Sequence, residues 1–186
     1  MKPLQSVAMG LVVIVLSAPF HGYDALPDPL GWVLVLMGVS ALPVDLTHRG
    51  NLLGLAMLAG VVSAVLWVPT VHSGLEDADP SLAWAASLPQ IAFTVLLCHA
   101  LAALATEAGD TRATRWLAFT RSAAIAVGLL PVLVFGAGVD SLELTSYLAA
   151  GVVAVLLIWL LFTYSGRPWA RATVPSSSTA TPPPES

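Results

Sequence analysis

Residues 21–50, HGYDALPDPLGWVLVLMGVSALPVDLTHRG, contain a Pro-rich turn, an apolar segment and a charged exit in direct succession. Asp28 and Pro29 mark a helix start, because an Asp at the N-cap accepts backbone N–H groups and Pro at the first helical position withholds no needed donor. The stretch predicts a helix over 29–47 of roughly 28 Å, close to the hydrocarbon core of a bilayer at about 30 Å. Pro43 is expected to bend its last third, since the ring removes a main-chain hydrogen bond.

The composition of the whole chain is typical of a protein that has lipid as its solvent. Of its 186 residues, 57% are hydrophobic and 10% are charged, and the mean hydropathy is +0.85, whereas about a quarter of a soluble domain is charged. A net charge of -4 and the lack of a Lys/Arg run argue against a nucleic-acid partner. The single cysteine, Cys98, allows no disulfide and no paired-thiol metal motif. We therefore expect an integral membrane protein whose partner is the lipid bilayer.

Five further apolar segments accompany the one after Asp28, and together they predict an all-α fold, a six-helix transmembrane bundle over 1–165. The expected helices are 4–20, 29–47, 52–71, 80–105, 116–137 and 142–164. We interpret the first as an uncleaved span, because Pro19 and Phe20 stand where a signal peptide would need a small-residue cleavage site. Residues 166–186 have neither apolar mass nor periodicity and are expected to form a disordered cytoplasmic tail.

The basic residues predict the orientation, since Lys and Arg stay on the cytoplasmic side. With six spans and a cytoplasmic N-terminus, all 7 basic residues fall inside: Lys2, Arg49, Arg112, Arg115, Arg121, Arg167 and Arg171. A re-entrant second segment would move Arg49 outside, so a full span is favoured. The high content of Ala, Val and Leu is typical of a GC-rich bacterial source. The expected location is the cell inner membrane, with both termini cytoplasmic.

Residues 26–43, LPDPLGWVLVLMGVSALP, resemble a segment of small uncharacterised bacterial multi-pass membrane proteins. In that segment an L-P-D turn, a Gly and an apolar run follow the first helix. The resemblance is confined to this segment. It implies an integral membrane protein and implies no activity, cofactor or catalytic residue.

Small residues recur at four-residue spacing on three of the expected helices. Such faces are typical of close helix contacts, because lipid provides no hydrophobic drive between helices. We interpret them as packing faces inside the bundle, the alternative being the seam of a homo-oligomer. They are Ala56, Gly60 and Ala64; Thr120, Ala124 and Gly128; and Ser146, Ala150 and Ala154.

Polar residues gather in two candidate clusters, of which the outer one contains groups that bind divalent cations. It comprises His21, Asp24, Asp28, His72 and Asp79. The spacing of these residues matches no metal site, and Asp28 and Asp79 are accounted for as helix caps. The outer cluster is therefore interpreted as a solvated loop surface, and no metal or other cofactor is expected.

The inner cluster lies at the predicted cytoplasmic side and comprises Asp45, His48, Arg49, His99 and Arg121. Asp45 and Arg121 can reach the same depth, so we interpret them as a structural ion pair. The alternative is a site for a solute or a proton. The structural interpretation is favoured because the middle of every span is apolar, whereas a transporter of charged solutes keeps ionisable residues there.

No triad, zinc, P-loop or dinucleotide motif is present in the sequence, so the expected function is non-enzymatic. The leading hypothesis is a membrane scaffold or accessory subunit, whose partner is another membrane protein or a second copy of the chain. The alternative is a small carrier or channel for a mostly neutral solute. Helices one to three and four to six start in opposite directions, and the second helix of each triplet is interrupted by Gly and Pro, as in 3+3 inverted repeats.

Overall fold

The computed structural model of the protein describes residues 2–16, 19–20, 23–24, 28–43, 46–66, 80–137 and 143–170. The α-helices of this part are α1 (Pro3–Val15), α2 (Asp28–Ser40), α3 (Arg49–Leu66), α5 (Pro80–Glu107), α6 (Thr111–Ala137) and α7 (Glu143–Tyr164). Two short antiparallel strands, β1 (Pro19–Phe20) and β2 (Tyr23–Asp24), lie between α1 and α2. A 3₁₀ turn, η2 (Pro168–Ala170), follows α7. The all-α prediction is confirmed.

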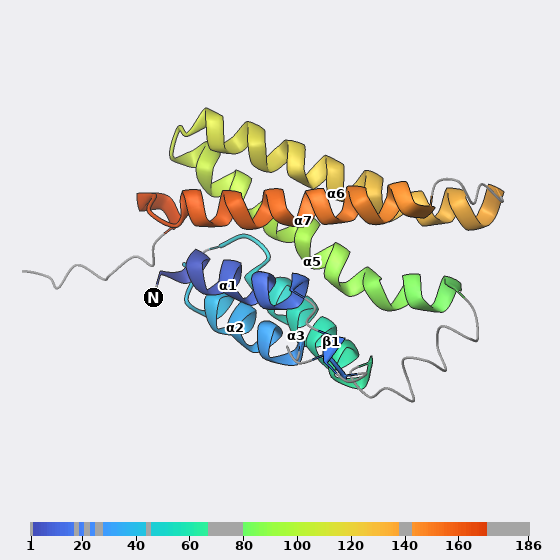
Figure 1. Ribbon diagram of the computed structural model, residues 1–186. Coiled ribbons are helices and arrows are strands. Elements are labelled where there is room, and N and C mark those ends of the chain that lie inside the picture. Colours follow the sequence, from blue (N-terminus) through green and yellow to red (C-terminus); the bar gives the residue numbers. More distant parts are fainter. Residues whose placement is uncertain are drawn as a thin grey trace, which may run out of the picture.

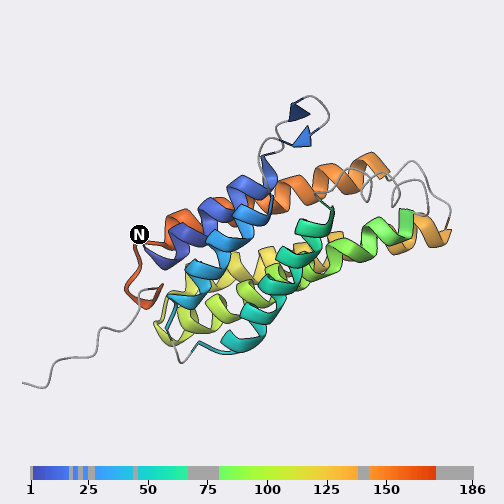
Figure 2. The same ribbon diagram turned by 90° about the horizontal axis from the view of Figure 1, so that it is seen from below.

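The six helices run back and forth and pack in sequence order (Figures 1 and 2). Each helix contacts the next along the chain, and α7 returns to contact α1, so the contacts close into a ring. The N-terminus, the α2–α3 and α5–α6 connections and η2 consequently lie at one end of the bundle (Figure 1). We call this the basic end, because it holds five of the six described basic residues, Lys2, Arg49, Arg112, Arg115 and Arg167, while Arg121 lies further along α6. Their gathering at one end agrees with the prediction that they share one side, and the assignment of that side to the cytoplasm stays a prediction.

Three described helical segments are long and apolar enough to cross a membrane, namely Arg49–Leu66, Trp84–Glu107 and Thr145–Tyr164. Their outward faces carry large apolar side chains: Val61, Leu148 and Val152 are 62%, 63% and 67% exposed. Apolar surface of this extent is unfavourable in water and suits a lipid environment. The chain thus has the surface and the helices of a membrane protein.

The first helix was expected over 4–20, but α1 ends at Val15, and Pro19 and Phe20 belong to β1. At the basic end, two helix boundaries differ from the predictions by five residues or more. The second helix was expected to run to 47 with a bend at Pro43, but α2 ends at Ser40. Pro43 disfavours helical geometry in the residue before it, so the helix ends ahead of the ring and no bend is needed. The fifth helix was expected from 116, whereas α6 starts at Thr111, because the Asp110 side chain caps it.

Glycine brings α1 and α2 into main-chain contact. A Cβ added to Gly31 would lie 2.7 Å from the carbonyl oxygen of Gly10, and one added to Gly38 would lie as close to the main chain of α1. Ser6 Oγ also donates a hydrogen bond of 3.0 Å to the carbonyl of Leu34 across the same interface. The α1–α2 pair therefore has little room for larger side chains.

An aromatic contact joins α2, α3 and α5 in the core. Trp32 is 2% exposed and meets the ring of Phe93 edge to face, with centroids 5.5 Å apart and an interplanar angle of 81°. Gly60 of α3 leaves room for Trp32, since a Cβ there would lie 3.1 Å from the Cβ of Trp32. Offset aromatic geometry of this kind adds about 0.5–1.5 kcal/mol to the burial itself.

The predicted small-residue faces have different locations. On α3, Ala56 is buried and Gly60 packs on Trp32, while Ala64 is exposed. On α6 all three positions are buried, and Gly128 lies against Ile91 of α5. On α7, Ala150 is exposed, and Ser146 and Ala154 are half-buried. The α3 and α6 faces thus contribute to internal packing, and the α7 face remains largely outside the bundle.

Candidate functional site at the basic end

His99 of α5 and Arg121 of α6 form a hydrogen-bonded pair near the basic end. Nη1 of Arg121 and Nδ1 of His99 are 2.9 Å apart. A guanidinium has donors only, so His99 Nδ1 is the acceptor and the imidazole carries its proton on Nε2. The pair therefore has one positive charge, on Arg121, and an N–H on the other side of the His99 ring.

His48 lies beside this pair and has an unusual backbone. Its ring centroid is 6.1 Å from that of His99, with the two planes inclined by 31°. Its φ is 61°, in the left-handed region that costs a residue with a Cβ about 1–2 kcal/mol. The His48 carbonyl accepts a hydrogen bond of 3.0 Å from the N–H of Leu52 in the first turn of α3. Backbone strain of this kind occurs preferentially at functional sites.

A groove of ≈ 580 Å³ opens to the surroundings between α3, α5 and α6, and the histidine–arginine pair forms part of its wall. Apart from His99, Arg121 and Ser122, the residues that line it are apolar. They are Leu55, Ala92, Val95, Leu96 and Ile125. We call it the lateral groove. It combines one polar wall with a long apolar one.

The six-span arrangement expected from the sequence would put the pair near a membrane boundary. α5 and α6 have 28 and 27 residues, or about 40 Å, which exceeds a hydrocarbon core of about 30 Å. His99 lies about 12 Å along α5 from its last residue, and Arg121 about 15 Å along α6 from its first. When the helices span a bilayer with their excess of about 10 Å at the basic end, the pair lies within about 5 Å of the hydrocarbon edge.

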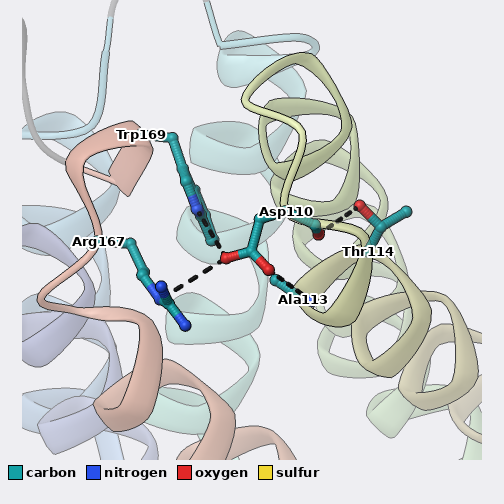
Figure 3. Close-up of polar contacts among 5 residues, drawn as sticks. All are labelled: Asp110, Ala113, Thr114, Arg167 and Trp169. Atoms are coloured by element: carbon teal, nitrogen blue, oxygen red, sulfur yellow. Dashed lines mark hydrogen bonds and ion pairs between the residues drawn. The ribbon is translucent and has the colours of Figure 1, made fainter.

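A second polar cluster, which sequence analysis missed, joins the α5–α6 connection to η2 (Figure 3). Asp110 Oδ1 accepts a hydrogen bond of 3.1 Å from the N–H of Ala113 and so caps α6. Its Oδ2 lies 3.5 Å from Trp169 Nε1 and 3.6 Å from Arg167 Nε. The Ala113 N–H is the main cause that lowers the pKa of Asp110, burial opposes it, and Trp169, Arg167 and Arg112 lower it further. In the sequence, Asp110 itself could have indicated this cap, because Asp is a preferred residue directly before the start of a helix.

Comparison of the chain with protein-family models, curated proteins and solved structures found no match.

The structure brings together three of the five inner-cluster residues, His48, His99 and Arg121. Asp45 lies outside the described residues, so its ion pair with Arg121 stays a prediction. Arg49 instead donates from Nη2 to the carbonyl of Ser40, the last residue of α2. A cation at this position satisfies a carbonyl that has no partner within the helix.

The outer cluster is only partly described. His21, His72 and Asp79 lie outside the described residues, Asp24 belongs to β2, and Asp28 is the first residue of α2. Among the described residues, no three His, Cys, Asp or Glu side chains are grouped as a metal site requires. The predicted helix start at Asp28 agrees with the observed one.

Proposed function

We propose that the chain is a six-span protein of the bacterial inner membrane, with both termini cytoplasmic, that serves as a non-enzymatic scaffold or accessory subunit. The observation that carries the proposal is an exposed patch of α7 formed by Tyr147, Ala150 and Gly151. Ala150 is exposed, and an added Cβ on Gly151 would meet nothing within 4 Å. Tyr147, one turn away, is 71% exposed. Small residues beside an aromatic ring suit close contact with a helix of another membrane protein.

The packing of the interior supports a structural role over transport. The buried polar residues of the described part of the chain are Ser6, Thr120 and Ser165, and none of them is ionisable. Thr120 donates to the carbonyl of Trp116 on its own helix, and Ser165, directly after α7, donates to the carbonyl of Phe162. A solute pathway needs polar groups that face a shared cavity, and these hydroxyls bond to nearby main chain instead.

A carrier or channel for a mostly neutral solute is the second candidate, and one observation favours it. Contacts are most extensive between α1 and α2 and between α5 and α6. They are less extensive between α2 and α3 and between α6 and α7, and least extensive between α3 and α5 and between α7 and α1. This order recurs after three helices, as in 3+3 repeats. The halves differ, however, in that α1 and α2 have 13 residues each against 28 and 27 in α5 and α6. In addition, α6 continues through Pro131, whereas α2 ends before Pro43.

Reporter fusions test the six-span arrangement. Fusions after Arg49 and Arg115 should give a cytoplasmic signal, and fusions at Asp24, Asp77 and Asp140 should give an external one. A cytoplasmic signal from the Asp77 fusion would contradict six spans. The arrangement also requires that the chain resist extraction from membranes by alkaline carbonate.

Co-purification in mild detergent tests the scaffold role. A membrane protein should be recovered in fixed ratio with the wild-type chain and should be lost from Gly151→Leu, which adds bulk to the α7 face. Gly54→Leu is the matched control, because Gly54 of α3 also has nothing within 4 Å of an added Cβ. Equal recovery with both variants would contradict the assigned face. Solute uptake into proteoliposomes, with no co-purifying protein, would favour the carrier.

A further inference from the structure

The lateral groove runs from a polar end into an apolar body. On α5 its lining residues Ala92, Leu96 and His99 follow one another at helical spacing, and His99 is nearest the basic end. On α6, Arg121 is likewise nearer the basic end than Ile125. The apolar body therefore extends about 10 Å from the pair toward the middle of the bundle. In a membrane this direction leads from the headgroup region into hydrocarbon.

Arg121 determines the charge of the group that suits the polar end. The guanidinium is always protonated, and its planar array of donors matches phosphate oxygens. His99 accepts from Arg121 through Nδ1, so its Nε2 is a second donor. The residues that line the lateral groove include no carboxylate. The polar end is thus complementary to an anion with several oxygen acceptors.

We infer that the lateral groove binds an anionic phospholipid of the inner leaflet, with its phosphate at Arg121 and His99 and an acyl chain along Leu96 and Ile125. This inference rests on the membrane-spanning arrangement proposed above. The location of the charge selects a lipid over a soluble anion, because the polar end lies at the hydrocarbon edge and the remaining wall is apolar. A zwitterionic lipid is disfavoured, since its ammonium group adds a cation next to Arg121.

Native mass spectrometry of the full chain, supplied with phosphatidylglycerol or with phosphatidylcholine of the same acyl chains, tests the inference. The wild-type chain should retain phosphatidylglycerol in preference to phosphatidylcholine. Arg121→Gln should weaken this retention by about tenfold or more, the effect of losing one hydrogen bond to a charged group. Arg115→Gln is the matched control, because Arg115 is an exposed cation near the same end of α6 and does not line the groove. It should retain phosphatidylglycerol as the wild type does.

A second variant tests the apolar body without a change of charge. Ala92 is exposed and lines the groove, so Ala92→Phe should fill the space for the acyl chain and release the lipid even if Arg121→Gln fails to fold. Equal retention of the two lipids, or retention unaffected by Ala92→Phe, would overturn the inference. Displacement of the lipid by inorganic phosphate would overturn it too, in favour of a soluble anion. Carbonate extraction reports insertion separately, so loss of lipid preference in a chain that still inserts leaves the six-span proposal intact.

Discussion

Asp110 and Trp169 join the α5–α6 connection to the turn that follows α7. Trp169 Nε1 donates to Oδ2 of Asp110 at 3.5 Å, across 59 positions of sequence, while Oδ1 of the same carboxylate caps α6 (Figure 3). Ala170, at the end of η2, is 1% exposed. One side chain thus both starts a helix and anchors the segment after the last one.

Substitution of Asp110 should separate these two roles. Asp110→Ala removes the cap and the anchor and should lower stability by about 1 kcal/mol or more, whereas Asp110→Asn keeps a capping oxygen and should cost less. Thermal unfolding in detergent, followed by circular dichroism, measures both. Equal melting temperatures for the wild type and Asp110→Ala would show that the cap contributes nothing.

The charge of Asp110 predicts a pH dependence. Its pKa in the folded protein is lower than the ordinary value of 3.8, chiefly because of the N–H of Ala113. A carboxyl whose pKa is depressed by folding stabilises the fold above its unfolded pKa, and this contribution is lost as the pH falls through the folded pKa. The advantage of the wild type over Asp110→Asn should therefore be constant above pH 3.8 and shrink below it. A melting-temperature difference that stays constant down to the lowest pH would contradict this assignment.

The α1–α2 contact predicts that a single methyl group is destabilising. Gly31→Ala places a Cβ 2.7 Å from the carbonyl oxygen of Gly10, so the helices must separate at a cost of about 1–3 kcal/mol. Gly151→Ala in α7 is the matched control, because its Cβ meets nothing within 4 Å and Ala is the better helix former. The control should have an unchanged or raised melting temperature. Equal effects of the two substitutions would mean that the contact does not limit helix approach.

The backbone of His48 predicts an order among its variants. With φ at 61°, glycine should be favoured over alanine by about 1 kcal/mol, although both lack the imidazole. His48→Gly should therefore melt at a higher temperature than His48→Ala. A reversed order would show that the residue leaves the left-handed conformation in solution.

Much of the helix order follows from the sequence because long apolar segments and Asp-Pro starts are local signals. α2 begins at Asp28, and α7 runs to Tyr164 as expected. A search for apolar segments does not detect helical turns made of polar residues, so the start of α6 at Thr111 was missed. The predicted tail from Gly166 likewise contains η2, whose contact with Asp110 is non-local.

The sequence put His99 and Arg121 in one cluster but did not predict that they are hydrogen-bonded to each other. Helical rise places His99 and Arg121 at similar heights, and the sequence therefore assigned both to the inner cluster. Which side chains face each other depends on the rotation of α5 and α6 about their axes. That rotation is set by tertiary contacts such as Gly128 on Ile91. The Gly10–Gly31 contact was missed for the same reason, since it needs two helices brought together.

Helix length has a consequence for the surrounding lipid. α1 and α2, at about 20 Å each, stand next to one another, while α5 and α6 are about twice as long. In the six-span arrangement proposed above, a bilayer in contact with both pairs cannot match both thicknesses, so the lipids beside α1 and α2 must compress or the whole bundle must tilt. Because long helices adapt to a thin bilayer by tilting, whereas short helices force a thick bilayer to thin, this mismatch costs more in thick membranes. The protein should therefore partition into thin bilayer regions and draw other short-spanning proteins toward the same side of the bundle.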